Sequence, residues 1–473
     1  MEVDQFIDEF GRYVDAGEAS LFVGAGFSVA AGYPPWPELV EPFRQALGID
    51  PIEDLAQLVQ YYQDSGVGSR KQVQDHIARA VRAVPQLPAD AVELEGHRLL
   101  GGLPISSTWT TNYDPLLEES ITPNEVIAED EQLARRLAPG AKRILKMHGS
   151  VPRLGVASDL VIARSDFERY EASHPRFWRL LTAEFLTRSL LFLGFSLEDP
   201  NMEQVLRLAR LLTADAQRQH FAIMKRPNTN PLIFDLKCRD FEAVGIHVIE
   251  IADFGEINPI LRRLVARCRP SRLYVSGSPP IGASTATGGA YPTRALSSIL
   301  EGMLEGLGNA LADTPIRLMS GSQVGATVGY AMLRQLRDRV EYDPDRFLLV
   351  RRAKDAPLDA PNERLGRLVF TGEDPSELRG HAFNEVRAVL VIGGQAGTAE
   401  EVQRARELDM GVVPLAATGG IAREVWDAVG ADFGAYRLGG QYVDRDEFDR
   451  LAHPDAAIAV AAAVQLAKQA LFL

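Results

Sequence analysis

The sequence predicts an α/β protein of two domains, each built on a doubly wound parallel sheet. The chain has 473 residues, of which 46% are apolar, and a single core stops growing at about 250–300 residues, so two domains are expected. Short apolar or β-branched runs alternate with amphipathic stretches, which is typical of parallel strands joined by helices. These runs form two separate series, and each series is long enough for its own sheet.

The first series contains six expected strands. Each is a short apolar run bounded by glycine or polar residues and followed by an amphipathic stretch. In order they are SLFVGAG (20–26), STWTTN (107–112), RILKMHG (143–149), LLFLGFS (190–196), HFAIMK (220–225) and HVIEI (247–251).

The second series begins again after residue 270 and contains five expected strands. They are RLYVSGS (272–278), IRLMSGS (316–322), RFLLVRR (346–352), AVLVIGG (388–394) and MGVVPLA (410–416). Between the two series, ILRRLVARCRPSR (260–272) reads as a helix that ends at Pro270. We therefore expect one domain over residues 1–268 and a second over 269–473. The segment 279–292, rich in Gly, Ser, Thr and Pro, follows a strand directly and is expected to be a binding loop rather than a linker.

Composition excludes several classes of function. The net charge of −14, from 50 basic and 64 acidic residues, gives no electrostatic footprint for nucleic acid or for an anionic membrane. The acidic N-terminus lacks the features of a signal peptide, and the Ala-rich segment 456–473 carries Gln and Lys, so it is expected to be a surface or core helix. Cys238 and Cys268 are too few for a disulfide framework. A cytoplasmic protein is expected.

A glycine-rich turn follows the first expected strand. Leu21–Val23 leads directly into Gly24, Ala25, Gly26 and Ser28. Small residues here let backbone N–H groups approach a pyrophosphate, and the start of the following helix favours its negative charge. The pattern alone does not separate a phosphate-binding loop from a tight strand-to-helix turn that uses glycine for its dihedral angles.

Three further polar clusters follow strands of the first series. They are TTNYD (110–114), KMHGS (146–150) and GFSLEDPN (194–201). Taken singly, His148 could be a hydrogen-bonded loop histidine, and Asn112 and Asp114 could be turn residues. Because parallel strands end at the same edge of a sheet, four such clusters are expected to converge on one crevice.

These four motifs, in this order, resemble the sirtuin superfamily over about residues 1–265. The resemblance implies that the domain binds NAD⁺ as its substrate. Asn112 would then position the nicotinamide ribose or the attacking water, Asp114 would hold the carboxamide, and His148 would serve as base or as partner of the ribose hydroxyls. The implied NAD⁺-binding residues are Gly24, Ala25, Gly26, Ser28, Thr111, Gly194 and Ser196.

The chemistry of the motif residues suits cleavage of a glycosidic bond. Breaking the bond between ribose and nicotinamide builds oxocarbenium character, so the leaving group must be oriented and an acceptor placed nearby. A histidine that titrates near neutral pH suits the role of a base that takes a proton from such an acceptor. Protein-deacetylating sirtuins carry a four-cysteine zinc ribbon, and this chain has two cysteines. We therefore expect water rather than an acyl-lysine peptide as acceptor, and no metal.

Glycines and hydroxyls also follow strands of the second series. The run from Gly393 to Glu401 resembles the SLOG family, a Rossmann-like nucleotide-binding group, through its Gly-Thr-x-x-Glu motif. The resemblance places Glu401 against a ligand ribose and Arg379 against its phosphates. Ile392 stands where the phosphoribohydrolases of that family have proline, which favours a sensor over a hydrolase. The implied effector-binding residues are Gly277, Ser278, Gly321, Ser322, Arg379, Thr398 and Glu401.

The order of a sirtuin half and then a SLOG half resembles the effectors of the Thoeris anti-phage system. The resemblance implies an NAD⁺ glycohydrolase that is activated when its SLOG domain binds a cyclic ADP-ribose isomer made by a TIR-domain partner, and that acts as a homotetramer or larger assembly. Three alternatives stay open. A non-catalytic nucleotide-binding scaffold would leave NAD⁺ intact, a phosphoribohydrolase would work without residues 1–265, and a deacylase would need an acyl-lysine peptide.

Overall fold

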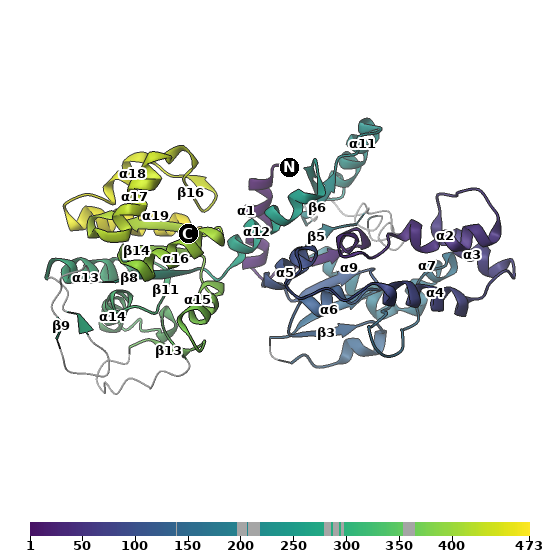
Figure 1. Ribbon diagram of the computed structural model, residues 1–473, viewed down its shortest axis with the longest axis horizontal. Coiled ribbons are helices and arrows are strands. Elements are labelled where there is room, and N and C mark those ends of the chain that lie inside the picture. Colours follow the sequence, from purple (N-terminus) through teal and green to yellow (C-terminus); the bar gives the residue numbers. More distant parts are fainter. Residues whose placement is uncertain are drawn as a thin grey trace. The chain divides into compact units, whose positions relative to one another are not determined.

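The computed structural model describes residues 1–138, 140–195, 206, 218–278, 285–286, 293–294, 298–352 and 365–473. The chain divides into two compact units, residues 1–265 and 266–473. Each unit contains one large, all-parallel sheet with helices against it (Figure 1). The predicted α/β class with two doubly wound parallel sheets is confirmed.

The first unit has a seven-stranded sheet in the order β3-β4-β2-β1-β5-β6-β7. All six predicted strands belong to it. The seventh, β3, was not predicted because it lies at the edge of the sheet and buries only Ile127 of its four residues. The strands are β1 (Ala19–Val23), β2 (Ser107–Thr110), β3 (Asn124–Ile127), β4 (Lys142–Lys146), β5 (Ser189–Leu193), β6 (His220–Lys225) and β7 (Ile246–Ile251).

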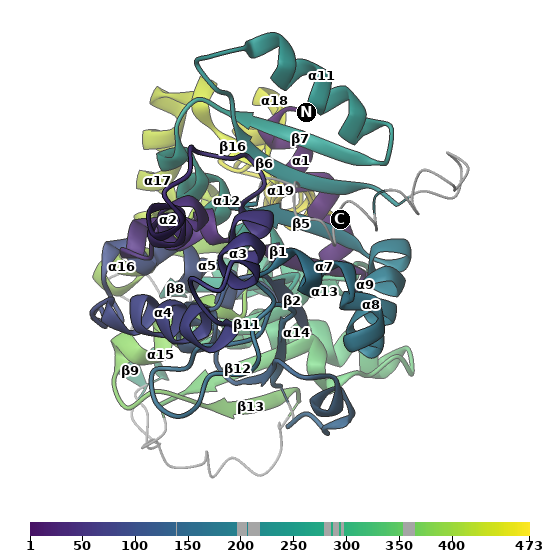
Figure 2. The ribbon, with the colours of Figure 1, turned by 90° about the vertical axis from the view of Figure 1, so that its right-hand side faces the viewer.

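Both faces of this sheet are covered by helices. On one face, Phe22, Trp109 and Leu190 join the core with buried residues of α9 and α11, and Figure 2 shows α11 against β7. On the other face, Phe6 and Phe10 of α1 pack against Phe221 of β6 with ring centroids 5.4 and 5.6 Å apart. The helices of this unit are α1 (Val3–Asp15), α5 (Glu95–Gly102), α6 (Leu116–Ser120), α7 (Arg164–Glu168), α8 (Tyr170–Ser173), α9 (Pro175–Thr187) and α11 (Pro231–Glu242), with α12 (Ile257–Cys268) crossing into the second unit.

Three more helices form a small bundle beside the sheet. They are α2 (Trp36–Leu47), α3 (Leu55–Asp64) and α4 (Arg70–Ala83), which gather on one side of the unit (Figure 2). Val40, Val59 and Ile77, one from each helix, are fully buried in a shared apolar cluster. Helix α4 begins with a capping box in which Ser69 and Gln72 satisfy each other's backbone N–H groups. The bundle forms a wall next to the carboxyl ends of β2 and β4.

The second unit has a six-stranded sheet in the order β13-β12-β11-β8-β14-β15. The five predicted strands are present, and the strand that was not predicted, β13, is again an exposed edge strand. The strands are β8 (Arg272–Ser278), β11 (Arg317–Ser320), β12 (Phe347–Arg351), β13 (Arg367–Phe370), β14 (Ala388–Gly393) and β15 (Gly411–Leu415), and two short antiparallel pairs add β9 (Thr285–Ala286) with β10 (Thr293–Arg294) and β16 (Arg437–Leu438) with β17 (Gln441–Tyr442).

Side chains of the second sheet alternate between two cores. Leu273 and Val275 of β8 enter the core formed with α13, α14 and α19, whereas Tyr274 enters the core formed with α15, α16 and α17. The predicted helix at 456–473 is α19, and nine of its residues are buried. The helices are α13 (Ser298–Ala312), α14 (Gln323–Asp338), α15 (Pro375–Asn384), α16 (Ala396–Glu407), α17 (Gly420–Ala431), α18 (Arg445–Arg450) and α19 (Ala456–Leu471).

The two cysteines, the segment 279–292 and the most apolar helices were also subjects of prediction. Cys268 is buried, Cys238 is half-buried, and neither forms a disulfide among the described residues. Of the predicted binding loop 279–292, only Thr285–Ala286 is described, so that prediction falls outside the described residues. Across the described part of the chain, no helix is long and apolar enough to cross a bilayer.

Both sheets have a switch point that brings loops together. In the first unit, β1 lies between β2 and β5, and in the second, β8 lies between β11 and β14. At such a point the connections after two neighbouring strands run in opposite directions, so their loops separate and leave a crevice at the carboxyl ends of the strands. Most of the residues predicted from the motifs lie at these strand ends, whereas His148 follows β4 and Arg379 lies in α15.

Candidate functional site

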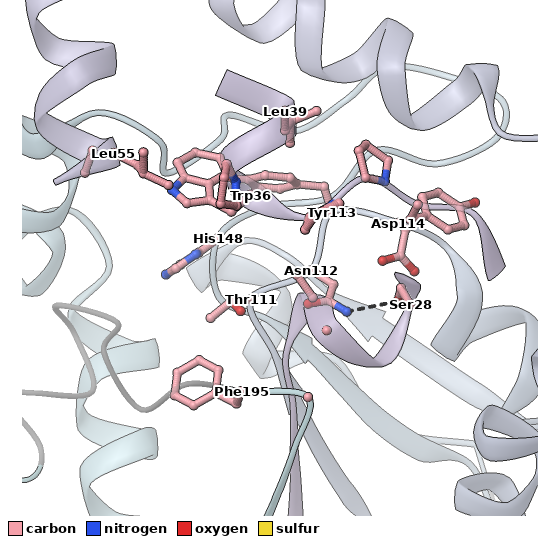
Figure 3. A pocket seen from close by; sticks show the side chains of 18 of the residues that line it. Ser28, Trp36, Leu39, Leu55, Thr111, Asn112, Tyr113, Asp114, His148 and Phe195 are labelled. Carbon is pink, nitrogen blue, oxygen red and sulfur yellow. Dashed lines mark hydrogen bonds between the residues drawn. The ribbon is translucent and has the colours of Figure 1, made fainter. Parts of the chain in front are cut away.

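The first unit contains a cavity of about 760 Å³ at the carboxyl ends of β1, β2, β4 and β5 (Figure 3). Eight of the residues predicted for this half line it: Ala25, Gly26, Ser28, Thr111, Asn112, Asp114, His148 and Gly194. Gly24 contributes a backbone carbonyl immediately behind the lining. Ser196 lies outside the described residues. The structure thus brings together motifs that span 170 positions of sequence, from Gly24 to Gly194.

Asn112 occupies the centre of this arrangement. Its side chain is 4% exposed, and its Nδ2 donates to the Gly24 carbonyl at 3.1 Å and to Ser28 Oγ at 3.2 Å (Figure 3). Its backbone N–H donates to Thr110 Oγ1. Its Oδ1 is buried and has no hydrogen-bond partner among the described residues. Because a buried acceptor without a partner is costly, this atom is placed to receive a donor from a ligand.

Glycine is required in the turn after β1 and at the end of β5 because the backbones of these two segments come close together. Gly194 has a φ of +60°, and a Cβ there would lie 2.3 Å from Phe27 N. A Cβ on Gly24 would lie 2.5 Å from the Gly194 carbonyl oxygen, which accepts a hydrogen bond from Gly26 N at 3.0 Å. The turn after β1 and the end of β5 are therefore held against each other by backbone contacts that any side chain would break.

His148 and Asp114 lie on either side of Asn112 (Figure 3). His148 is 4% exposed, and its ring meets the Phe167 ring edge to face at a centroid distance of 5.2 Å. Asp114 Oδ1 accepts from Leu116 N at 3.1 Å, which fixes the carboxylate at the start of α6. The cavity thus presents a histidine, a carboxamide and a carboxylate in one row.

Lys146 is a functional residue that the motif analysis passed over. It is the last residue of β4 and is fully buried. Its ammonium donates to the carbonyls of Tyr113 and Asp114, at 3.2 and 2.5 Å, and to Glu118 Oε1 at 3.0 Å. The buried ammonium of Lys146 therefore holds the backbone of the loop that carries Asn112 and Asp114. The signal in the sequence was a lysine directly after the apolar pair Ile144–Leu145 at the end of a strand, because a buried lysine needs a partner.

Replacing Lys146 by methionine should lower the free energy of unfolding by about 3–5 kcal/mol, because Glu118 would stay buried without its partner. Burial already raises the pKa of Glu118, and Lys146 opposes that rise. Without the ammonium the folded variant holds a proton that the unfolded chain releases, so its stability falls as the pH rises. Urea unfolding should show the smallest deficit near pH ~4, where the carboxyl is protonated in both states, and the largest above neutrality.

The control for this prediction is the double variant Lys146→Met with Glu118→Gln. Removing both charges should recover most of the lost stability, because no uncompensated carboxylate remains. A deficit that stays constant across the pH range, or a double variant as unstable as Lys146→Met, would contradict the assigned pair.

Much of the cavity wall comes from segments without a recognisable motif. Trp36 and Leu39 of α2, Leu55 of α3 and Phe167 of α7 line it, and Figure 3 places Trp36 and Leu55 beside His148. Arg164 Nη1 meets Asp54 Oδ2 at 2.7 Å across the rim. In sequence these residues belong to ordinary amphipathic stretches, so only the packing of the helical bundle on the sheet reveals them.

The second unit gathers its predicted residues around Glu401. Glu401 accepts from Tyr274 OH at 3.2 Å and from the Ser276 hydroxyl. Arg379 Nε lies 3.6 Å from Glu401 Oε1, and its Nη1 donates to Glu400. Burial raises the pKa of Glu401, although Ser276, Arg379 and Tyr274 each lower it. Tyr274 and Ser276 were not predicted, although alternate positions of β8 face the same side.

The remaining predicted residues of this unit lie at or after the carboxyl ends of β8, β11 and β14. Ser278 Oγ is buried with no partner among the described residues, whereas Ser322 Oγ accepts from Gly325 N and caps α14. Gly277 is required by strand pairing, since a Cβ there would lie 2.2 Å from the Ile392 carbonyl oxygen. Thr398 is buried in the first turn of α16. Gly321 accepts a hydrogen bond from Arg351 through its carbonyl.

A metal site was not expected in either half. Within the residues that the structure describes, no group of three or more His, Cys, Asp or Glu side chains could hold a metal ion.

Comparison with known proteins gives matches in both units. Residues 106–249 match the SIR2-like domain, and residues 391–464 match the Sir2- and TIR-associating SLOG family. Similar curated proteins are the NAD(+) hydrolase ThsA of Bacillus cereus, 28% identical over 92% of this chain and 91% of its own, and that of Enterococcus faecium, 28% identical over 92% of both chains. The NAD(+) hydrolase ThsA of Acinetobacter baumannii is 26% identical over 94% of both chains.

These matches cover nearly the whole chain and both units, in the order in which the two sheets occur. The chain is therefore similar to ThsA over nearly its whole length, with a match to the SIR2-like domain ahead of a match to the Sir2- and TIR-associating SLOG family.

Proposed function

We propose that this protein hydrolyses NAD⁺ to nicotinamide and ADP-ribose in its first unit, and that a cyclic ADP-ribose isomer bound to its second unit switches that activity on. The observation that carries the first part is the convergence of Asn112, Asp114, His148 and a glycine-rich turn on one cavity. The similarity to curated NAD(+) hydrolases over the full chain supports the same reaction.

The arrangement suits hydrolysis of the bond between nicotinamide and ribose. The reaction consumes NAD⁺ and water and yields nicotinamide, ADP-ribose and a proton. Asp114 would hold the carboxamide of the leaving group, and Asn112 Oδ1 would accept from the ribose or from the attacking water. His148 would take the proton that the water loses. The helical wall would exclude bulk water, which strengthens each of these interactions.

The cavity is large enough for a dinucleotide. A volume of about 760 Å³ lies within the range of about 300–1,000 Å³ that small-molecule sites occupy. The backbone N–H groups of the glycine-rich turn would face the pyrophosphate. Arg164 is the one Lys or Arg among the described lining residues, and it is paired with Asp54 and Glu168.

In the second unit, Arg379 and Glu401 have the chemistry needed to bind a cyclic ADP-ribose isomer. A guanidinium grips phosphate oxygens in a bidentate way, and an ionised carboxylate accepts from ribose hydroxyls. The match to the Sir2- and TIR-associating SLOG family supports a TIR-domain partner as the source of the ligand. We further propose that the protein acts as a homotetramer or larger assembly. Its role would be to deplete NAD⁺ in phage-infected cells.

One incubation tests the proposal. The full-length protein is mixed with NAD⁺, with and without each cyclic ADP-ribose isomer, and nicotinamide and ADP-ribose are quantified by chromatography. We expect rapid cleavage only with an activating isomer, and the same rate in EDTA because no metal is required. Intact NAD⁺ under every isomer would favour a binding scaffold. Turnover of a nucleotide monophosphate by residues 269–473, or turnover that needs an acyl-lysine peptide, would favour the other two enzymes.

A further inference from the structure

Helix α12 contains the point at which the chain passes from the first unit to the second. Its residues up to Val265 belong to the first unit, and Ala266 begins the second. The bonds that α12 and the residue directly after it form inside each unit therefore decide what the helix is attached to on either side. On both sides, the attachment is to an element of a candidate site.

In the second unit, the end of α12 is attached to the helix that carries Glu401. Arg269 is 9% exposed, and its Nη1 donates to the Leu408 carbonyl at 2.9 Å. Leu408 is the C-cap of α16, whereas Thr398 and Glu401 lie in the first half of this 12-residue helix. A cation suits the free carbonyls at the C-terminus of a helix. Because a helix is a rigid element, a ligand that shifts the first turn of α16 also shifts the carbonyl that Arg269 holds.

A second bond attaches the same residue to β14. Arg387 is 4% exposed and directly precedes this strand, and its Nε donates to the Arg269 carbonyl at 2.8 Å. Strand β14 ends at Gly393, and α16 begins three residues later. The two elements that meet beside Glu401 are therefore both bonded, at their opposite ends, to the residue that follows α12.

In the first unit, α12 is attached to the start of α5. Arg262 holds the Glu95 carboxylate with two bonds, from Nε to Oε1 at 2.6 Å and from Nη2 to Oε2 at 2.7 Å. A bidentate pair of this kind fixes orientation as well as distance. Asn258 adds one bond to Glu95 at 3.3 Å, which is longer than an ordinary N–H···O bond. Arg262 therefore supplies the main link between α12 and α5.

The residues next to Glu95 pack on the glycine-rich turn. His97 is 1% exposed, and the centroid of its ring lies 4.7 Å from that of Phe27. A Cβ on Gly96 would lie 2.8 Å from Phe27 Cζ. Phe27 ends the short helix η1 (Ala25–Phe27), whose first two residues line the cavity. A shift of α5 therefore moves the turn that would hold the pyrophosphate of NAD⁺.

We propose that α12 carries the effector signal between the two sites, with Arg269 as its contact in the second unit and Arg262 as its contact in the first. Binding at Glu401 displaces α16, Arg269 passes the displacement to α12, and Arg262 passes it through Glu95 to the glycine-rich turn. Both arginines are positioning residues, and neither lines the NAD⁺ cavity. This inference rests on the proposed function and adds to it a route that no motif indicated.

The test compares Arg262→Met with Arg263→Met. The two arginines are neighbours on α12 and each forms an ion pair, but Arg263 pairs with Asp4 of α1, a helix that packs against β6 and away from the cavity lining. Methionine keeps the apolar part of the side chain and removes its charge. Arg262→Met should lower the ratio of effector-stimulated to basal NAD⁺ cleavage by at least about fivefold, the lower end of ordinary coupling. Arg263→Met should keep the wild-type ratio.

Calorimetry separates loss of coupling from loss of binding. Both variants should bind the activating cyclic ADP-ribose isomer with the wild-type affinity, because neither change touches the second unit. Thermal unfolding is measured on each, and the half-exposed Arg262 should be replaceable without loss of the fold. Binding without activation in Arg262→Met is the expected result. Unchanged activation of Arg262→Met, or an equal loss in Arg263→Met, would overturn the inference.

Hydrogen exchange follows the route without relying on catalysis. The isomer that binds most tightly by calorimetry should change amide exchange in α16, α12, α5 and the glycine-rich turn of the wild type. In Arg262→Met the change should stop before α5. Coupling is reciprocal, so NAD⁺ added to the slow variant His148→Ala should change exchange in α16, and adding Arg262→Met to that variant should abolish the change.

These measurements also distinguish failure of the route from failure of the proposed function. If no isomer stimulates cleavage but NAD⁺ still alters exchange in α16 through Arg262, the proposed switch fails and the route stands. If cleavage is stimulated and exchange in α5 responds equally in the wild type and Arg262→Met, the switch stands and the route is overturned. Exchange changes that stay within the unit of the bound ligand in the wild type would also overturn the route.

Discussion

Replacing Asn112 by alanine should slow NAD⁺ cleavage by the activated protein by at least about 100-fold, which is an ordinary loss for a group that orients a reacting water or ribose. The side chain donates both to the Gly24 carbonyl and to Ser28 Oγ, and its Oδ1 has no partner in the described part of the chain. The change therefore has two effects: it removes the acceptor at the centre of the cavity, and it loosens the glycine-rich turn. His148→Ala should give a loss of similar size.

A matched control is Asn258→Ala. Asn258 also donates through Nδ2, to Glu95 at 3.3 Å, but it does not line the cavity. NAD⁺ turnover is measured by release of nicotinamide at a saturating concentration of the activating isomer, with thermal unfolding and effector titration run on each variant. Asn258→Ala should keep full activity. A folded Asn112→Ala protein that still turns over at the wild-type rate would remove Asn112 from the reaction.

Replacing Arg379 by alanine should raise the effector concentration for half-activation by about 10–100-fold, because a hydrogen bond to a charged group contributes about 1.5–3 kcal/mol. The guanidinium lies between Glu400 and Glu401, so it is held at the carboxyl end of the sheet where a phosphate would arrive. An effector shifts the population of the active state only through its differential affinity for that state. Weaker binding therefore appears as a higher half-activation concentration, with the NAD⁺ site unharmed.

Glu401→Gln should have a comparable effect while preserving packing. The amide keeps the shape of the side chain and can still accept from Tyr274 OH, but it loses the charge that ribose hydroxyls favour. The control is Arg404→Ala, since Arg404 lies on the same helix α16 and pairs only with the exposed Glu407 among the contacts described. Calorimetry of the full-length variants with the activating isomer gives the affinities. Wild-type binding by both Arg379→Ala and Glu401→Gln would place the effector site elsewhere.

The positions of the central strands followed from the sequence because burial on both faces leaves a continuous apolar run. β1 and β5 bury all five residues each, and their runs were visible without any structure. β3 and β13 were missed for the opposite reason. Each lies at a sheet edge and is only four residues long. β13 has the apolar run Leu368–Phe370 but buries none of its residues, so its position as an edge strand followed only from the structure.

The part of the candidate site that depends on backbone geometry could be predicted from the sequence. Gly24, Gly26 and Gly194 are needed because the loops after β1 and β5 come within contact distance, and such positions stand out as glycines at strand ends. Asn112, Asp114 and His148 follow strands that the topology must bring to one edge. The doubly wound class was expected, whereas the strand order, with β1 between β2 and β5, came from the structure.

The sequence by itself determined the two-sheet class, the central strands of both sheets and the polar groups at their carboxyl ends, because these are fixed by local apolar periodicity and by the steric needs of glycine. Only the tertiary structure decided that Lys146 supports the Asn112–Asp114 loop and that Tyr274 and Ser276 hold Glu401. Each of those roles depends on which distant side chain lies opposite. How the helices pack on a sheet decides which side chains lie opposite each other, and the local sequence around a lysine, tyrosine or serine does not encode that packing.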